Sequence, residues 1–142
     1  MKISILGAGN VGMALARALL RAGQPVTIGV PDPARYTEAV ATLGTQATLT
    51  GSDDAAEAGE LVILAVPYTA ALTIAQARSD WQGRVLVDAT HPLAPGLAGL
   101  SLGTTTSGAE QIAERARGAR VVKALNTTGA ENMADSRYAQ GQ

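Results

Sequence analysis

The sequence predicts a doubly wound α/β fold, in which helices cover both faces of one parallel sheet. Short apolar runs alternate with helix-periodic segments along the whole chain, which is typical of βαβ units. Two of the runs, Leu61–Val66 and Arg84–Asp88, have the continuous apolar character of strands buried on both faces. Right-handed crossovers then favour six strands in the order 3-2-1-4-5-6, in one three-layered domain over residues 1–142.

Bulk properties restrict the class of protein. The chain has 142 residues, a formal net charge of −1 and no cysteine. Disulfides and thiolate metal sites are therefore excluded, and no basic field favours nucleic acid or an anionic membrane as a partner. No apolar stretch approaches the roughly 18 residues of a transmembrane helix, and no signal peptide is apparent. A cytoplasmic protein is expected.

The first half of the chain is expected to contain three strands and three helices. The first helix, with an apolar face around Val11, Ala14 and Leu15, should end before Gly23, a natural residue after a helix C-cap. A Pro-Asp-Pro turn follows the second strand, and Ser52-Asp53-Asp54 is expected to cap the third helix. The expected strands cover residues 2–6, 25–29 and 47–49, and the expected helices cover residues 10–21, 34–43 and 52–58.

The second half repeats the alternation. Strands are expected at residues 61–66, 84–88 and 120–125, and helices at residues 69–77 and 107–117. Pro67 should end the fourth strand, because proline cannot donate to a ladder. The loop 91–106, rich in Pro, Gly and Thr, is long enough to be functional or mobile. An exit loop without a further element is expected after the sixth strand.

The most informative motif is Gly7-Ala-Gly9-Asn-Val-Gly12, which lies between the first strand and the first helix. In this context Gly7 permits a tight turn, Gly9 allows the backbone to approach a pyrophosphate, and Gly12 allows the helix to pack closely on the strand. The helix N-terminus then faces the phosphates. The motif predicts a Rossmann dinucleotide site; the alternative is a glycine-rich turn that binds nothing.

Ligands of open α/β sheets bind at the carboxyl ends of the strands, where the strand order reverses. Small or polar residues follow four of the expected strands at this edge. The segments are Gly7–Gly12, Val66-Pro67-Tyr68, Ala89-Thr90-His91-Pro92 and Asn126-Thr127-Thr128-Gly129. Pro67, Thr90 and Asn126 are therefore candidate cofactor contacts. Tyr68 and Trp81 are interpreted as packing residues, although Tyr68, next to Pro67, can also contact a bound ring.

Five segments together resemble a known enzyme family. They are Ile5–Gly12, Val26-Thr-Ile-Gly29, Leu64-Ala-Val-Pro67, Val87-Asp-Ala-Thr-His-Pro-Leu93 and Val122-Lys-Ala-Leu-Asn-Thr-Thr-Gly-Ala130. They look like the coenzyme-dependent NADP oxidoreductases, which exchange hydride between NADP and a reduced deazaflavin. The reductase domains of STEAP metalloreductases are relatives of this family, and the N-terminal domains of pyrroline-5-carboxylate reductases are more distant ones. The resemblance covers about residues 2–133.

The resemblance implies a role for several positions. Ala8, Gly9, Asn10 and Val11 would contact the pyrophosphate. Val66 and Ala70 would lie near the adenosine or ribose, and His91 and Ala130 near the nicotinamide. Members of this family transfer hydride between two stacked rings, so the protein mainly orients them and excludes water.

His91 is the only histidine of the chain. It can contact the nicotinamide, take part in acid–base chemistry, or be an ordinary loop residue; many relatives carry Asn there, which favours positioning over proton transfer. Asp88 has a mainly structural interpretation. Lys123 lies either near a ligand or on the surface.

The choice between NADP and NAD is left open by the sequence. The family usually has Gly-Ser-Arg after the second strand, where this chain has Gly29-Val30-Pro31. Arg35 matches a basic position that helps to hold the 2′-phosphate of NADP. Asp32 can instead accept from a ribose 2′-hydroxyl, as in NAD binders, or can serve as a turn or N-cap residue. The resemblance slightly favours NADP.

The family's members continue for some 70 residues beyond the equivalent of Gln142, so part of the second substrate's pocket is expected to be missing. Val121 and Val122 would leave an apolar edge strand, which favours a homodimer. The Tyr138–Gln142 tail is too polar to cover that strand.

Two functions are compatible with this pattern. The first is an NAD(P)-dependent oxidoreductase with a deazaflavin or flavin partner. The alternative is a stand-alone module that binds or senses the dinucleotide without turnover. With one histidine and no cysteine, no metal constellation is expected, and the serines and threonines lack a paired base for nucleophilic catalysis.

Overall fold

Six parallel strands form one twisted sheet in the order β3-β2-β1-β4-β5-β6. The computed structural model describes residues 1–91 and 106–135 of the chain. The strands are β1 (Ile3–Leu6), β2 (Val26–Val30), β3 (Ala47–Gly51), β4 (Leu61–Leu64), β5 (Val85–Asp88) and β6 (Arg120–Lys123). The order reverses between β1 and β4, so the carboxyl ends of these two strands border the crevice in which such sheets bind ligands.

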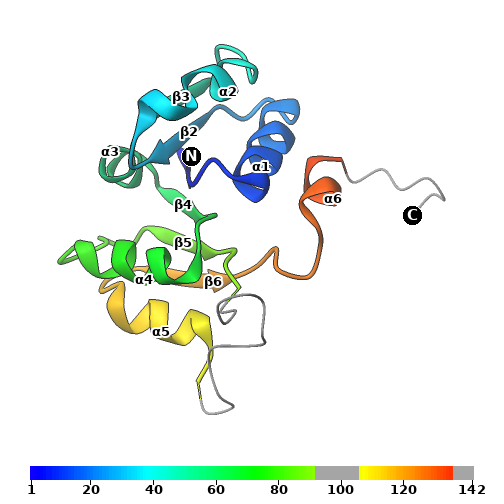
Figure 1. Cartoon of the computed structure of the whole chain (residues 1–142). Coiled ribbons are helices and arrows are strands. Elements are labelled where there is room, and N and C mark those ends of the chain that lie inside the picture. The colour runs from blue at the N-terminus through cyan, green and yellow to red at the C-terminus, as the bar shows by residue number, and fades with distance from the viewer. Residues whose placement is uncertain (92–105, 136–142) are drawn as a thin grey trace.

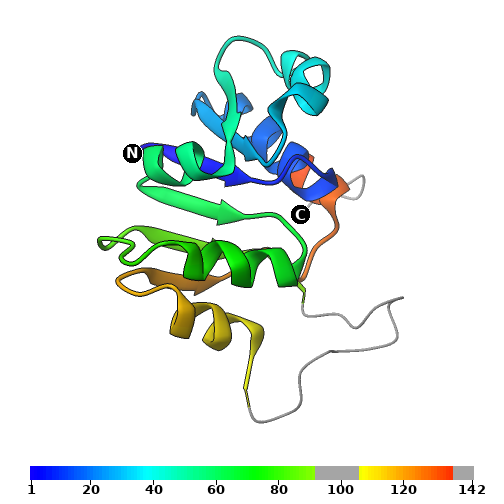
Figure 2. The same ribbon diagram turned by 60° about the vertical axis from the view of Figure 1, so that its left-hand side comes forward.

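Helices cover both faces of this sheet, which gives three layers (Figure 1 and Figure 2). One face carries α1 (Asn10–Arg21), the 3₁₀ turn η1 (Pro33–Tyr36), α2 (Thr37–Ala41) and α6 (Ala130–Ala134). The other face carries α3 (Ser52–Ala58), α4 (Tyr68–Ala77) and α5 (Gly108–Arg115). The predicted Rossmann class and strand order are confirmed.

The apolar strands supply two cores, because successive side chains point to opposite faces. Ile5 and Ile63 pack under α1, whereas Leu6 and Leu64 pack under α3 and α4. Trp81 is fully buried in the second core, and its indole N–H donates to the carbonyl of Ala75 (2.9 Å). The interpretation of Trp81 as a packing residue is consistent with this position.

Three local expectations need correction. The helix expected over residues 34–43 is divided, because the chain starts as a 3₁₀ turn at Pro33 and becomes α-helical only at Thr37. Gly51 is the N-cap of α3, so Ser52-Asp53-Asp54 lies inside the first turn and makes no side-chain cap. No element was expected after the sixth strand, whereas α6 follows it; five residues are too few to produce a helical periodicity.

The other boundaries agree closely with the sequence. Gly23 has a positive φ (76°), its N–H donates to the carbonyl of Leu20, and the next N–H, of Gln24, donates to Leu19. This Schellman arrangement ends α1 where the glycine predicted it. Most of the long loop 91–106, and the tail 138–142, lie outside the described residues.

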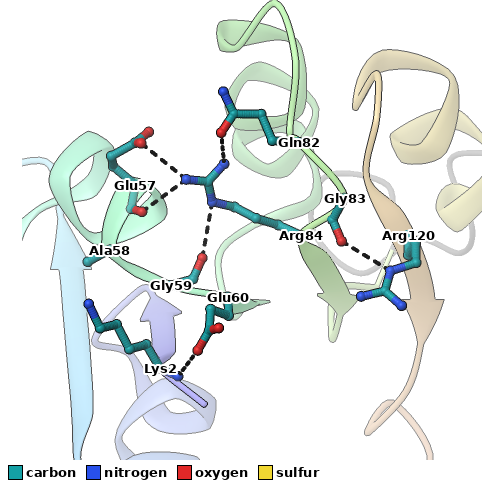
Figure 3. A pocket seen from close by; sticks show the side chains of 9 residues that line it. All are labelled: Lys2, Glu57, Ala58, Gly59, Glu60, Gln82, Gly83, Arg84 and Arg120. Atoms are coloured by element: carbon teal, nitrogen blue, oxygen red, sulfur yellow. Dashed lines mark hydrogen bonds and ion pairs between the residues drawn. The ribbon is translucent and has the colours of Figure 1, made fainter.

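A network of charged residues closes the amino edge of the sheet, opposite the reversal point (Figure 3). A depression of about 510 Å³ lies there. Arg84 spans it and donates to the carbonyls of Gly59 (3.1 Å), Glu57 (3.2 Å) and Trp81, and to the side chains of Glu57 and Gln82. Because these carbonyls include those at the end of α3, Arg84 neutralises a helix C-terminus. We therefore interpret this depression as structural.

Candidate functional site

The three glycines of the first turn differ in what surrounds them. Gly7 has a φ of +110°, and a Cβ there would lie 2.2 Å from the carbonyl oxygen of Ala65. A Cβ on Gly12 would lie 2.1 Å from the carbonyl oxygen of Gly7. A Cβ on Gly9 would meet no protein atom within 4 Å. The fold therefore requires glycine at positions 7 and 12, while the space beside Gly9 is left open.

Two helix N-termini meet at this open space. α1 has Gly9 as its N-cap and α4 has Pro67, and neither cap provides a side-chain hydrogen bond. The first bonds within these helices are donated by Met13 and Ala71, so the preceding N–H groups of each first turn have no helical partner. Free N–H groups and two positive dipole ends make this a favourable place for an anion.

A cleft of about 300 Å³ lies between these two helix ends. It is lined by Gly9, Asn10, Val11, Ala65, Val66, Pro67, Tyr68, Ala89, Thr90 and His91. The structure thus brings together residues from the ends of β1, β4 and β5, as the strand-end argument predicted. Ala89 belongs to one of the strand-end segments named from the sequence, whereas Ala65 was not among the candidate contacts.

Tyr68 forms part of this wall. Its hydroxyl donates to Oε1 of Gln111 (2.8 Å), and burial raises the pKa of its phenol. Tyr68 is therefore a neutral side chain anchored between α4 and α5. The sequence predicted a packing role for Tyr68 and also its place at a strand end beside the ligand site, and its position in the cleft agrees with both.

A second hollow of about 410 Å³ adjoins the glycine turn on the other side. Its lining comes from the turn, from α1 and from α6, and includes Ala8, Gly9, Asn10, Arg17 and Ala130. α6 lies beside α1 in both views, and the guanidinium of Arg21 donates to the carbonyl of Ala134 (Figure 1 and Figure 2). This packing brings Ala130 next to Gly9. Arg17 was missed, although it lies two helical turns after Asn10.

His91 links the ends of two strands. Its Nε2 lies 2.9 Å from the carbonyl oxygen of Asn126. Because a carbonyl can only accept, we assign the hydrogen of this bond to Nε2. Asn126 therefore contributes to the site through its backbone.

The remaining candidates lie outside both hollows. The side chain of Val30 is buried in the core, whereas Pro31, Asp32 and Arg35 are exposed after β2. Asp32 occupies the N-cap position of η1, but its carboxylate accepts no capping bond. Ala70 is half-buried in α4. A ligand that extended from the cleft over the end of β2 would reach Pro31, Asp32 and Arg35.

Two further features follow from the described ranges, 1–91 and 106–135. They contain no group of three metal-ligating His, Asp or Glu side chains. None of the helices in these ranges has the length and apolar character needed to cross a membrane.

This geometry agrees with comparisons to known proteins. The sequence profile described as NADP oxidoreductase, coenzyme F420-dependent, matches residues 2–92. The chain belongs to this family of F420-dependent NADP oxidoreductases. An F420-dependent NADP reductase of Methanothermobacter marburgensis is 33% identical over 95% of the chain and 67% of its own length. The family resemblance seen in the motifs is thus confirmed.

Two solved structures of similar proteins extend the comparison. A protein of Sinorhizobium meliloti described as hypothetical has a TM-score of 0.89 and 31% identity, over 99% of this chain and 68% of the other. A proposed F420-dependent NADP reductase of Arthrobacter sp. FB24 has a TM-score of 0.82 and 36% identity, over 95% of this chain and 66% of the other. This F420-dependent oxidoreductase family member therefore spans about two thirds of the length of such relatives.

Proposed function

We propose that this family member is an oxidoreductase that binds a nicotinamide dinucleotide, with NADP as its cofactor, and exchanges hydride with the deazaflavin F420. The observation that carries the proposal is the open space at Gly9. No packing contact and no unusual φ requires glycine there, yet a side chain at Gly9 would project into the gap between two helix N-termini. That gap fits a pyrophosphate in shape and in charge.

The residues present would hold the dinucleotide in a defined direction. The pyrophosphate would lie over the turn Gly7–Gly12, against the N–H groups of Asn10 and Val11. The adenosine half would extend over the end of β2 towards Asp32 and Arg35. The nicotinamide would lie in the cleft that Tyr68 closes, towards Thr90 and His91, with Ala130 on the far side of the glycine turn. Val66, Pro67 and Ala70 would line the way between the two ends.

When bound, a nicotinamide dinucleotide supplies or accepts the hydride. The task of this chain would then be to orient the ring and to keep water away from one of its faces. The cleft is well suited to this, because its wall contains Ala65, Val66, Ala89 and the anchored Tyr68. No acid–base group is needed for a direct hydride transfer, which agrees with a positioning role for His91.

NADP is favoured by the name of the Methanothermobacter relative and by Arg35. The Arg35 guanidinium is exposed just after β2, and it has no hydrogen-bond or ion-pair partner among the described residues. An exposed arginine at this position is well placed to hold a 2′-phosphate. Asp32 would favour NAD instead, because its carboxylate can accept a hydrogen bond from a ribose 2′-hydroxyl.

The reaction can be tested by following NADPH and NADH oxidation with F420, flavins and ferric chelates as acceptors. We expect turnover with F420 and NADPH. Binding of a nucleotide without turnover with any acceptor would contradict the enzymatic part of the proposal and leave the alternative, a module that binds or senses the dinucleotide.

A homodimer through the β6 edge is part of the proposal. β6 is an edge strand, and Val122 on it is 48% exposed. Light scattering is expected to give a dimer for the wild type and a monomer for Val122→Lys, because a charge on an apolar edge prevents pairing. A monomeric wild type would contradict this part.

A further inference from the structure

An ion pair between a buried carboxylate and a partly exposed ammonium lies next to Thr90, which lines the cleft together with His91. Asp88, the last residue of β5, is fully buried. Its Oδ1 accepts hydrogen bonds from the N–H of Thr90 (2.9 Å) and from the hydroxyl of Thr90 (2.7 Å). Its Oδ2 pairs with Nζ of Lys123, the last residue of β6, at 3.2 Å. The pair thus connects the ends of two neighbouring strands.

Lys123 also holds Thr90. Its ammonium donates to the carbonyl of Thr90, so the ion pair binds the N–H, the hydroxyl and the carbonyl of this one residue. In a trans peptide the carbonyl and the next N–H point in opposite directions. The N–H of His91 is therefore turned away from Lys123, and no described residue accepts a hydrogen bond from it.

A second connection fixes the same segment from the other side. Nε2 of His91 bonds to the carbonyl of Asn126, and between Lys123 and Asn126 the chain turns through Leu125, whose φ is +68°. A bulky residue rarely adopts this strained conformation, and residues held in it cluster at functional sites. The chain keeps this strained corner next to the Thr90–His91 peptide.

Strand pairing alone does not explain the ion pair. β5 and β6 are already joined from Val85–Asp88 to Arg120–Lys123, and the N–H of Ala124 continues the ladder to the carbonyl of Asp88 (3.1 Å). Burying the Asp88 carboxylate costs free energy, and its partly exposed partner Lys123 offsets only part of that cost. The contacts of the pair with Thr90, a residue of the cleft wall, indicate instead that the pair serves the cleft.

We propose that Asp88 and Lys123 are positioning residues, which fix the Thr90–His91 peptide so that the His91 N–H can donate to the carboxamide oxygen of a nicotinamide ring. This inference rests on the proposed function, since it assumes that the nicotinamide lies at this end of the cleft. It follows that binding of the nicotinamide half of the ligand depends on the ion pair, whereas binding of the adenosine half does not.

The test compares two ligands on the same variants. NADPH and 2′-phospho-ADP-ribose, which lacks the nicotinamide, are titrated into the full chain calorimetrically. In the double variant Asp88→Asn/Lys123→Met no unpaired buried charge remains. We expect its NADPH affinity to fall about tenfold, as for the loss of one or two hydrogen bonds, while that for 2′-phospho-ADP-ribose stays within about twofold. Lys123→Arg, which keeps the charge next to Asp88, should bind NADPH about as well as the wild type.

Glu57→Gln is the matched control, because it removes the carboxylate that pairs with Arg84 at the opposite edge of the sheet (Figure 3) and with Arg78. It should change neither affinity. Equal losses for both ligands in the double variant, or no loss for either, would overturn the inference. Asp88→Asn, which preserves the shape of the buried side chain, gives the same comparison if the double variant does not fold. A wild type that binds neither ligand would instead contradict the proposed function.

Discussion

The three glycines of the motif differ in whether the fold requires them, and Gly9 is the one that it does not require. Gly7 and Gly12 are required by the fold, since a Cβ at either would overlap a backbone carbonyl. Gly9 has φ −77° and ψ −169°, an ordinary extended conformation, and space around it. The motif identifies all three glycines from the sequence. The structure shows in addition that the fold does not require glycine at position 9.

Gly9→Asp should therefore abolish nucleotide binding and leave the fold intact. Asp is a good N-cap, so α1 is not weakened. A carboxylate about 4 Å from a phosphate costs on the order of 4 kcal/mol at an effective dielectric constant of 20, or a hundredfold or more in affinity. The measurements are calorimetric titration with NADPH and thermal unfolding.

Gly9→Asn is the control for side-chain bulk, because it has the same size and capping ability without the charge. Its loss should be smaller than that of Gly9→Asp. Gly12→Ala, in contrast, should lower the unfolding temperature. Unchanged NADPH affinity in Gly9→Asp would mean that the glycine turn has no part in binding.

Arg35 tests the choice of nucleotide. If its guanidinium holds the 2′-phosphate, Arg35→Ala should weaken NADP about tenfold, as for the loss of a charge-assisted hydrogen bond, and leave NAD unchanged. Arg117→Ala removes an exposed arginine after α5 and is the matched control. Equal effects of Arg35→Ala on both nucleotides would show that Arg35 acts by general charge and not on the phosphate.

At the scale of elements, strong local signals predicted the fold and weak ones did not. Gly23 fixes the end of α1, and Ser107 with Glu110 forms the capping box that begins α5. The predicted start of that helix at Ser107 was therefore within one residue. α6 has five residues and no side-chain cap, so its position depends on packing against α1, which no local pattern encodes.

The same distinction applies to the site. Strand ends could be located from apolar runs, and the sheet rule then placed Val66, Thr90 and His91 together. The hydrogen bonds from Thr90 to Asp88 and from Lys123 to Thr90 could not be predicted, because they depend on the pairing register of β5 and β6. Likewise, Asn126 was identified by its side-chain type, whereas the structure uses its backbone carbonyl.

The amino edge offers a test of electrostatics between elements, because Glu57 of α3 pairs with Arg78 after α4 and with Arg84 before β5. The hydrogen bond from Arg78, with the charge of Arg84, lowers the pKa of Glu57. A carboxyl with a lowered pKa in the folded state adds stability above its unfolded pKa, about 4.3, and loses it as the pH falls through the folded value. Glu57→Gln should therefore unfold at a lower temperature than the wild type at pH 7, and this difference should disappear in strong acid.

Glu114→Gln is the matched control, because Glu114 is exposed and makes no ion pair within the described ranges. Its unfolding temperature should follow that of the wild type at both pH values. A difference for Glu57→Gln that persisted below pH 3 would mean that shape, and not charge, explains its effect.

At the scale of the molecule, the two edges of the sheet have separate roles. Ion pairs and carbonyl contacts of Arg84 close the amino edge (Figure 3). At the carboxyl edge lie small residues, two hollows around one glycine, and N–H groups that have no backbone partner among the described residues. Open α/β sheets bind ligands at this second edge. The family, the topology and the local geometry thus agree on where a nucleotide would lie.

The most direct test of this account is a calorimetric titration of the wild-type chain with NADPH, repeated with NADH. The account predicts saturable binding of one NADPH per chain, weaker binding of NADH, and competition by 2′-phospho-ADP-ribose for the same site. Absence of binding for both nucleotides would contradict the central claim, that the cleft between the ends of α1 and α4 holds a nicotinamide dinucleotide.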